Sequence, residues 1–206
     1  ELENPIVENE FHVEYLYNEI LTPEVLIETI EHYLFCFDFK LPNGKKARTF
    51  FFPRYHQRRT VINITNDIIR KYKKNNHLDL KYLVQHSAGS GKSYTIAVIQ
   101  KFLRYLHVSN QAILNSIVIL TDRINLDSQL KETVVSSETQ KDIIAYVKST
   151  DELAQALNKN TKVIISTIQK FSVNKLNELL EEQKGKKICF IIDEAHRSQS
   201  GKLQRH

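Results

Sequence analysis

Residues 85–93 read QHSAGSGKS, a stretch whose residue types and spacing could bind phosphate. It matches the pattern G-x-x-x-x-G-K-[ST], except that His86 replaces the first glycine, which mainly shapes the turn into the loop. In such a loop Lys92 would reach the β- and γ-phosphates, and the Ser93 hydroxyl would help to hold Mg²⁺. Successive backbone N–H groups are expected to surround the β-phosphate, namely those of Gly89, Ser90, Gly91, Lys92 and Ser93. A Gly-Lys-Ser turn in an unrelated loop is the alternative interpretation.

A second polar set, DEAH, directly follows the apolar run at residues 188–192. A carboxylate at the end of a buried strand can bind Mg²⁺ through water, and Asp193 has this position. Glu194 can orient and partly deprotonate an attacking water, while His196 and Arg197 lie near the expected γ-phosphate or a partner domain. Acidic residues commonly end strands, so this pair becomes specific only in combination with the Gly-Lys-Ser stretch.

The elements that must position these residues alternate along the chain. Four short apolar runs, rich in β-branched residues, predict strands buried on both faces: KYLVQ, SIVIL, KVIIS and ICFII. The first of these predicted strands ends near Val84, and a helix is expected to begin at about Lys92. Further helices are expected to begin near Leu126, Asp151 and Asn174. Strand–helix alternation of this kind predicts an α/β fold with a mainly parallel sheet and helices on both of its faces.

Residues 1–50 have a different character and carry no catalytic constellation. Pro23 follows Thr22 at the start of a predicted helix whose apolar positions continue at helical spacing to Tyr33 and Phe37. Aromatic runs on both sides of Asn43-Gly44 then predict a hairpin. We therefore predict a small helix and hairpin lead-in or linker over residues 1–50, and an α/β lobe over residues 51–206.

The composition fits this organisation. Of the 206 residues 41% are hydrophobic and 26% are charged, which is enough for a real core, and the net charge of +5 is compatible with a polyanionic partner. The two cysteines, Cys36 and Cys189, have no metal-ligand spacing, and no apolar run approaches a bilayer span, so a cytoplasmic location is expected. The absence of methionine indicates an internal piece of a longer protein.

Five strings that occur in order narrow the interpretation: PRYHQ, QHSAGSGKS, VILTDRINLDSQL, STIQKF and DEAHRSQSG. Together they closely resemble the motor segment of the restriction (R) subunit of type I restriction–modification enzymes, which are superfamily 2 helicase-like motors. This family commonly has histidine at the first position of the phosphate-binding loop. The resemblance covers roughly residues 50–206, and more weakly the chain from about residue 10. It implies a RecA-like P-loop domain that uses ATP and Mg²⁺.

The resemblance also implies roles for matching positions. Gln57 looks like the glutamine that reads the adenine edge, since an amide can donate and accept at once, with Arg54, Tyr55 or His56 in support. Two groups of residues, one after the predicted strand SIVIL and one after KVIIS, resemble motifs that contact the nucleic-acid backbone without reading its sequence. The candidate DNA contacts are Thr121, Asp122, Arg123, Thr167, Gln169 and Lys170. Gln57 could instead be an ordinary surface residue, and Arg123 could form an ion pair with Asp122.

In this family a nuclease domain with a D…E-x-K site precedes the motor and a second helicase lobe follows it, and neither pattern occurs within these residues. The resemblance implies translocation of duplex DNA coupled to ATP hydrolysis before cleavage, with methyltransferase and specificity subunits as partners. Because charge from the second lobe completes such ATP sites, we expect these 206 residues alone to bind Mg·ATP weakly and hydrolyse it little.

Three alternatives stay open at the level of sequence. The chain could belong to another superfamily 2 motor, such as an RNA helicase or a repair helicase, although DRINLDSQL and HRSQSG argue against it. A P-loop kinase or plain nucleotide-binding module would leave Gln57 and DEAH unexplained. The chain could also be a docking module that binds nucleotide without turnover. Because the residues of the predicted ATP site are intact, such a module would have lost turnover by truncation rather than by mutation of the site.

Overall fold

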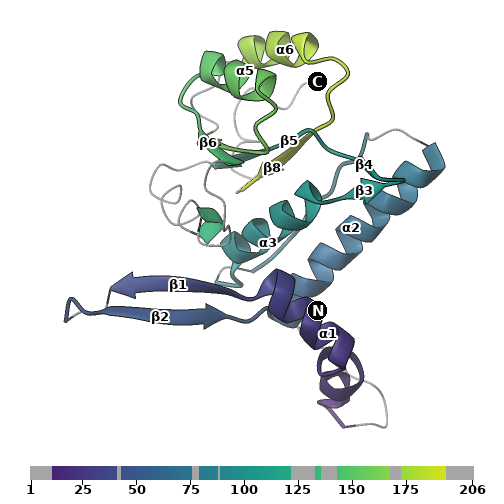
Figure 1. The fold of residues 1–206 in the computed structure, drawn as a ribbon, viewed down its shortest axis with the longest axis vertical. Helices are drawn as coiled ribbons and strands as arrows, with labels where there is room; N and C mark the ends of the chain where they lie inside the picture. Colours follow the sequence, from purple (N-terminus) through teal and green to yellow (C-terminus); the bar gives the residue numbers. More distant parts are fainter. Residues whose placement is uncertain are drawn as a thin grey trace.

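The chain folds into a small parallel sheet with helices around it, preceded by a projecting hairpin (Figure 1). The computed structural model describes residues 11–40, 43–75, 79–87, 89–121, 133–135, 143–167 and 173–193. The helices in these ranges are η1 Leu16–Ile20, α1 Pro23–Glu28, η2 Thr29–Tyr33, α2 Tyr55–Asn75, α3 Lys92–Arg104, α5 Thr150–Asn158 and α6 Val173–Glu182, where η marks a π-helical turn. The strands are β1 Phe35–Lys40, β2 Lys46–Phe51, β3 His107–Val108, β4 Gln111–Ala112, β5 Ser116–Thr121, β6 Ile144–Tyr146, β7 Val163–Thr167 and β8 Ile188–Ile192.

The central sheet contains four parallel strands in the order β6-β7-β5-β8. Three of them are the predicted runs SIVIL, KVIIS and ICFII, whereas the short strand β6 was not predicted from the sequence. Strands β5 and β7 are buried along their whole length, as their unbroken apolar sequences require. At the edge, β8 is only partly buried, and its last residue Ile192 is 44% exposed.

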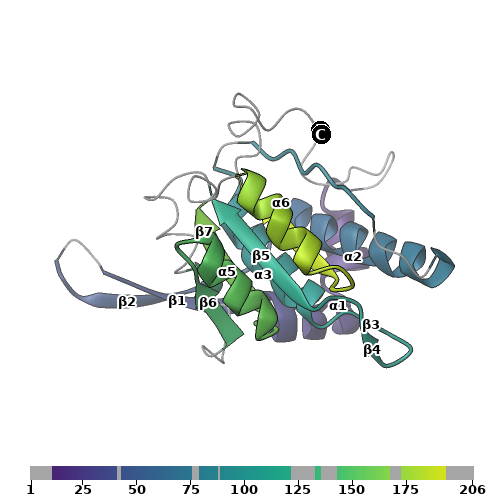
Figure 2. The same cartoon turned by 90° about the horizontal axis from the view of Figure 1, so that it is seen from above.

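Alternate residues of the central strands enter two separate cores. Ile117 and Ile119 of β5 pack into the core that contains α2 and α3, whereas Val118 and Leu120 pack into the core that contains α5 and α6. Figure 2 shows this layering, with α5 and α6 in front of β5 and α3 behind it. The predicted α/β fold with helices on both faces of a parallel sheet is confirmed.

The predicted strand KYLVQ is wrong in this structure. Residues 79–87 form no strand, and Leu83 is 86% exposed. This segment runs back along α2, where the Tyr82 hydroxyl donates to an Asp67 carboxylate oxygen at 2.8 Å and Lys71 lies 5.6 Å from the Tyr82 ring centroid. Side-chain contacts with the helix therefore hold this run of the chain, although its apolar composition is that of a strand.

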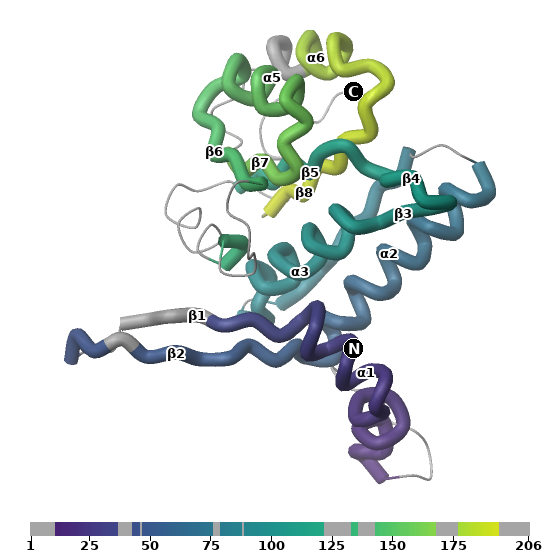
Figure 3. The backbone as a smooth tube through the Cα atoms, in the orientation of Figure 1, coloured from purple at the N-terminus to yellow at the C-terminus, as the bar shows by residue number. Residues whose placement is uncertain are grey.

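The lead-in contains the predicted helix start and hairpin, but the helix ends earlier than predicted. A helix begins at Pro23 as predicted, but it continues through η2 only to Tyr33, and Phe37 lies in strand β1. Strands β1 and β2 form an antiparallel hairpin that projects from the body in Figure 3, and Gly44 in the turn has φ of 80°. The boundary predicted between residues 50 and 51 stays a prediction.

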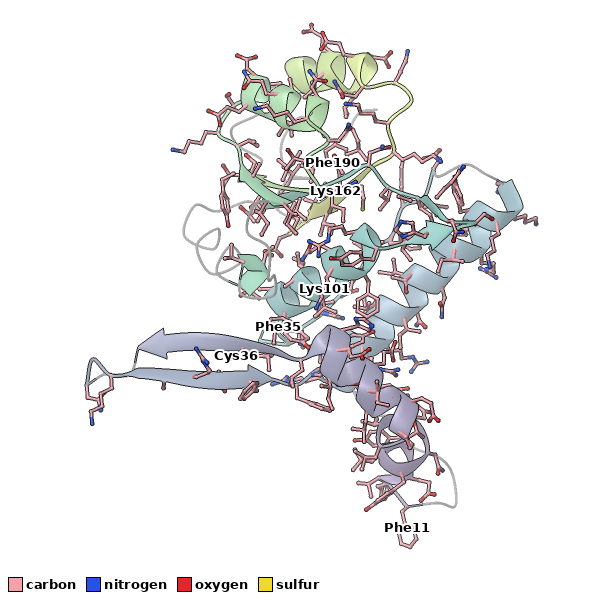
Figure 4. All side chains as sticks on the ribbon, in the orientation of Figure 1. Phe11, Phe35, Cys36, Lys101, Lys162 and Phe190 are labelled. Carbon is pink, nitrogen blue, oxygen red and sulfur yellow. The ribbon has the colours of Figure 1, made fainter. Side chains whose placement is uncertain are left out.

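An aromatic cluster attaches the lead-in to the lobe. The Tyr94 ring of α3 lies between Phe35 and Phe51, with ring centroids at 4.9 and 5.0 Å, and the Tyr94 hydroxyl donates to the Tyr33 carbonyl at 2.7 Å. Figure 4 shows Phe35 at this junction, and Phe11 at the far end of the lead-in. Tyr33 and Phe35 thereby enter the same core as α2 and α3.

Candidate nucleotide-binding site

The glycine-containing loop has the backbone conformation that its sequence predicts. Gly89 and Gly91 have φ of 75° and 83°, values that side chains disfavour, and α3 begins directly afterwards at Lys92. The residues other than glycine with positive φ among the described residues are Ser109, Asn110 and Asn160. His86 therefore occupies its position without the conformation that would demand glycine, which explains why the departure from the general pattern is tolerated.

The start of α3 suits an anion. Gly91 is the residue that precedes the helix, no side-chain hydrogen bond caps it, and the first turn contains no acidic residue. The first N–H groups of a helix lack intrahelical acceptors and carry the positive end of the helix dipole. Ser90 is 4% exposed and its Oγ has no hydrogen-bond partner among the described residues, whereas its N–H closes a turn onto the Ser87 carbonyl at 3.3 Å. These residues fit a bound phosphate.

Gln57 is buried against this loop. Its Oε1 accepts from the Arg54 N–H at 2.8 Å, and its Nε2 donates to the carbonyls of Ser90 and Gly91 at 3.0 and 3.3 Å. The Arg54 carbonyl accepts the first hydrogen bonds of α2, so Gln57 also caps the helix on which it lies. With an exposure of only 2%, this side chain is not the surface residue of the alternative interpretation.

The contact with Gln57 restricts the loop further. A Cβ atom added to Gly91 would lie 2.5 Å from the Gln57 Nε2, whereas nothing lies within 4 Å of a Cβ added to Gly89. Gly91 is therefore required for two reasons, its positive φ and the side chain packed against it. The sequence alone predicts the first reason but not the second.

Two histidines meet beside the loop. The rings of His56 and His86 are edge to face with centroids 5.0 Å apart, His56 Nε2 is 3.2 Å from the Ser90 carbonyl, and His86 Nε2 is 3.3 Å from Thr60 Oγ1. Burial lowers the pKa of His86, and the nearby His56 and Lys92 lower it further. Thr60 was not predicted; the available signal was its position one helical turn after His56.

A second group of candidate site residues lies at the carboxyl ends of the parallel strands. Thr121 and Thr167 are register partners at the ends of β5 and β7, and each is 1% exposed with a hydroxyl that has no partner among the described residues. Asp193 follows β8 at the same edge, where its N–H donates to the Leu120 carbonyl at 2.9 Å. Thr121, Thr167 and Asp193 thus lie at the same edge of the sheet, and their roles stay predictions.

Several predicted residues lie outside the described ranges: Asp122, Arg123, Gln169, Lys170, Glu194 and His196. Their roles stay predictions. Among the residues that are described, no group of three or more His, Cys, Asp or Glu side chains could hold a metal ion. Of the predicted Mg²⁺ ligands Ser93 and Asp193, only Asp193 is of these residue types, so the prediction for this pair stays untested.

Neither cysteine is in a disulfide, and burial raises the pKa of the Cys189 thiol to about 11. This agrees with structural rather than reactive thiols. None of the helices in the described part of the chain is both long and apolar enough to cross a membrane.

Comparison with known proteins supports the predicted resemblance. The chain is 36% identical over 125 residues to the type I restriction enzyme SauMSSORF170P endonuclease subunit of Staphylococcus aureus, an alignment that covers 59% of this chain and 13% of the relative. It is 38% identical over 130 residues to the HindI endonuclease subunit of Haemophilus influenzae, covering 58% and 12%. A third relative, the MjaVIIIP endonuclease subunit of Methanocaldococcus jannaschii, is 29% identical over 205 residues, covering 90% and 19%.

The chain thus spans less than a fifth of the length of these curated relatives. Its similarity to endonuclease (R) subunits of type I restriction enzymes confirms the predicted resemblance. The family model of the SWI2/SNF2 ATPases matches residues 56–206, a range that holds Gln57, the glycine-containing loop and the whole parallel sheet. Because this match covers more than half of the chain, the chain is a member of the SWI2/SNF2 ATPase family.

Proposed function

We propose that this chain is the ATP-binding motor lobe of a type I restriction endonuclease R subunit, where Mg-ATP hydrolysis drives translocation of duplex DNA. The observation that carries this proposal is the uncapped start of α3 behind two glycines of positive φ, with Lys92 as the first helical residue. The names of the similar endonuclease subunits support the assignment to a restriction system.

In this proposal each loop residue has a role. The N–H groups at the start of α3 hold the β-phosphate, and Lys92 neutralises charge on the β- and γ-phosphates. Ser93 and Asp193 would hold Mg²⁺, which when bound neutralises charge that develops on the phosphates. Glu194 would orient the attacking water, and His196 would contact the γ-phosphate region.

Adenine recognition by Gln57 requires a rearrangement. Both Nε2 hydrogens and the Oε1 of Gln57 are engaged by the loop and by Arg54. An adenine edge must therefore replace at least one of these protein partners. We propose that Arg54, whose side chain is exposed beside Gln57, stacks on or pairs with the nucleotide during this exchange.

The wider setting of the motor is proposed on the family resemblance. Duplex DNA would contact Thr121, Asp122, Arg123, Thr167, Gln169 and Lys170 through its backbone, and the complex would include methyltransferase and specificity subunits in the cytoplasm. Burial of Thr121 and Thr167 means that DNA contact there requires the adjoining segments to move or to supply the exposed groups. We expect the 206 residues alone to hydrolyse ATP little, since a second lobe completes such sites.

The lysine at the start of α3 gives the direct test of the phosphate site. Lys92→Ala in the protein at its full natural length should weaken binding of a fluorescent ATP analogue by roughly 10-fold or more, because a charge-assisted phosphate contact is lost. Lys101→Ala, at the opposite end of the same helix (Figure 4), should bind the analogue as the unaltered protein does. Unchanged binding by Lys92→Ala would remove the phosphate assignment.

A further inference from the structure

The geometry points to His86 and Thr60 as positioning residues that, with His56, join the start of the phosphate-binding loop to α2. Thr60 is in the first turns of α2, and His86 is the residue that replaces the first glycine of the general pattern. This role depends on the proposed function, since the loop that is held is the proposed phosphate site.

The three residues form a continuous chain of contacts. His56 Nε2 is 3.2 Å from the Ser90 carbonyl, the Thr60 hydroxyl donates to the His56 carbonyl at 2.8 Å, and Thr60 Oγ1 is 3.3 Å from His86 Nε2. The two imidazole rings pack edge to face. One turn of α2 therefore contacts the loop at its first residue and again in its middle.

The hydrogen positions follow from the acceptors. A carbonyl can only accept, so His56 carries its hydrogen on Nε2. The single hydrogen of Thr60 points to the His56 carbonyl, so Thr60 Oγ1 accepts from His86, which also carries its hydrogen on Nε2. The Nδ1 atoms of both rings are buried and have no partner among the described residues. Both histidine rings are thus committed to one orientation, with a donor nitrogen of each toward the bridge.

Gln57 and His56 hold the end of the loop near the helix, where they share the Ser90 carbonyl and Gln57 also contacts the Gly91 carbonyl. The contact between Thr60 and His86 instead lies at the entry of the loop, in the segment of residues 79–87. That preceding segment forms no strand and so has no ladder hydrogen bonds to fix it. The bridge through Thr60 and His86 supplies the missing attachment at the entry of the loop.

The contacts of His86 predict that glycine, the residue of the general pattern, is less suitable at position 86. Since His86 does not have positive φ, a glycine there would relieve no backbone strain and would remove the donor to Thr60 and the ring against His56. His86→Gly restores the general pattern G-x-x-x-x-G-K-S but should loosen the loop. Binding of nucleotide should therefore become weaker in the variant that matches the pattern better.

The test uses the protein at its full natural length, with binding of a fluorescent ATP analogue and steady-state ATP hydrolysis as readouts. His86→Gly and Thr60→Val should each raise Kd and KM for nucleotide roughly 3- to 10-fold, the effect of one hydrogen bond, with kcat changed less. Thr60→Ser keeps the hydroxyl and should restore binding to within about twofold of the unaltered protein.

A matched control lies further along the same helix. Thr65 also donates its hydroxyl to carbonyls of α2, those of Val61 at 2.8 Å and Ile62 at 3.2 Å, and among the described residues its hydroxyl has no hydrogen bond to the loop. Thr65→Val should therefore leave Kd for the analogue unchanged, while it should lower thermal stability to a similar extent as Thr60→Val. Circular dichroism of each variant checks that the fold is retained.

The double variant decides whether the two residues act together. If His86 and Thr60 form one bridge, His86→Gly combined with Thr60→Val should bind nucleotide no more weakly than the worse single variant. Additive losses, or unaltered binding in His86→Gly, would overturn the positioning role even if Lys92→Ala still weakened binding as proposed. Unaltered binding in Lys92→Ala would instead contradict the proposed function itself, so the two failures are distinguishable.

Discussion

At the scale of single residues, Gly91 is the most constrained position of the loop. Gly91→Ala places a Cβ at positive φ and 2.5 Å from Gln57 Nε2, so the amide must leave the Ser90 and Gly91 carbonyls. We expect a loss of about 1–2 kcal/mol for the backbone and about 1 kcal/mol more for each hydrogen bond that is broken. Urea unfolding of the variant and of the unaltered protein measures the sum.

Gly44 provides the matched control for this substitution. Its φ is 80°, close to that of Gly91, but nothing lies within 4 Å of an added Cβ. Gly44→Ala should therefore show the backbone contribution alone. Equal losses of stability in Gly91→Ala and Gly44→Ala would contradict the contact with Gln57.

The partly buried imidazole of His86 should make folding depend on pH. Its folded-state pKa lies below the ordinary value of 6.5, so the unfolded chain binds a proton that the folded chain does not as the pH falls through about 6.5. The free energy of unfolding should then decrease as the pH falls from 7.5 to 5.5. The His86→Gln variant cannot take up this proton, so its free energy of unfolding, measured with urea, should decrease less over the same pH range. Equal decreases in the variant and the unaltered protein would count against a neutral His86 in the folded state.

Residue identities could be predicted from the sequence only where the chemistry is local. The glycines of the loop and Lys92 follow from a nine-residue pattern, and their conformation agrees with it. The partners of Gln57 lie 33 and 34 residues away in the chain, and the sequence contains no signal for that distance. Thr60 was missed for the same reason, since its importance depends on His86, 26 residues later.

At the scale of elements, the junction between the hairpin and α3 depends on Tyr94. Tyr94→Phe keeps the stacking on Phe35 and Phe51 but removes the buried hydrogen bond to the Tyr33 carbonyl, so stability should fall by about 1 kcal/mol. Tyr105→Phe, on an exposed ring that follows the same helix, should change stability by less than about 0.5 kcal/mol. Chemical denaturation compares the two, and a Tyr94→Phe variant as stable as Tyr105→Phe would contradict this account of the junction.

The elements that could be predicted are those whose sequence pattern matches their final burial. SIVIL and KVIIS are buried on both faces and lie in the centre of the sheet, as their unbroken apolar runs require. KYLVQ was predicted as a strand from its own short apolar run, but in this structure Tyr82 is bound to Asp67 of α2. Composition does not distinguish a strand from an extended segment held by side chains, because the difference lies in the neighbour that the segment pairs with.

At the scale of the whole molecule, the chain aligns with only a small part of each similar endonuclease subunit. The similar endonuclease subunits are more than five times as long as the alignments with this chain. In the proposed function, phosphate binding by α3 and base binding near Gln57 depend on local residues, whereas hydrolysis needs charge from a second lobe. The central claim, a motor driven along duplex DNA, therefore has to be measured on the protein at its full natural length.

The most direct measurement is the rate of ATP hydrolysis by that protein with and without duplex DNA, and with RNA of equal length. The account predicts that duplex DNA raises kcat by roughly tenfold or more, that RNA does not, and that Lys92→Ala abolishes the stimulated rate. Stimulation by RNA and not by duplex DNA, or a stimulated rate that survives Lys92→Ala, would contradict it.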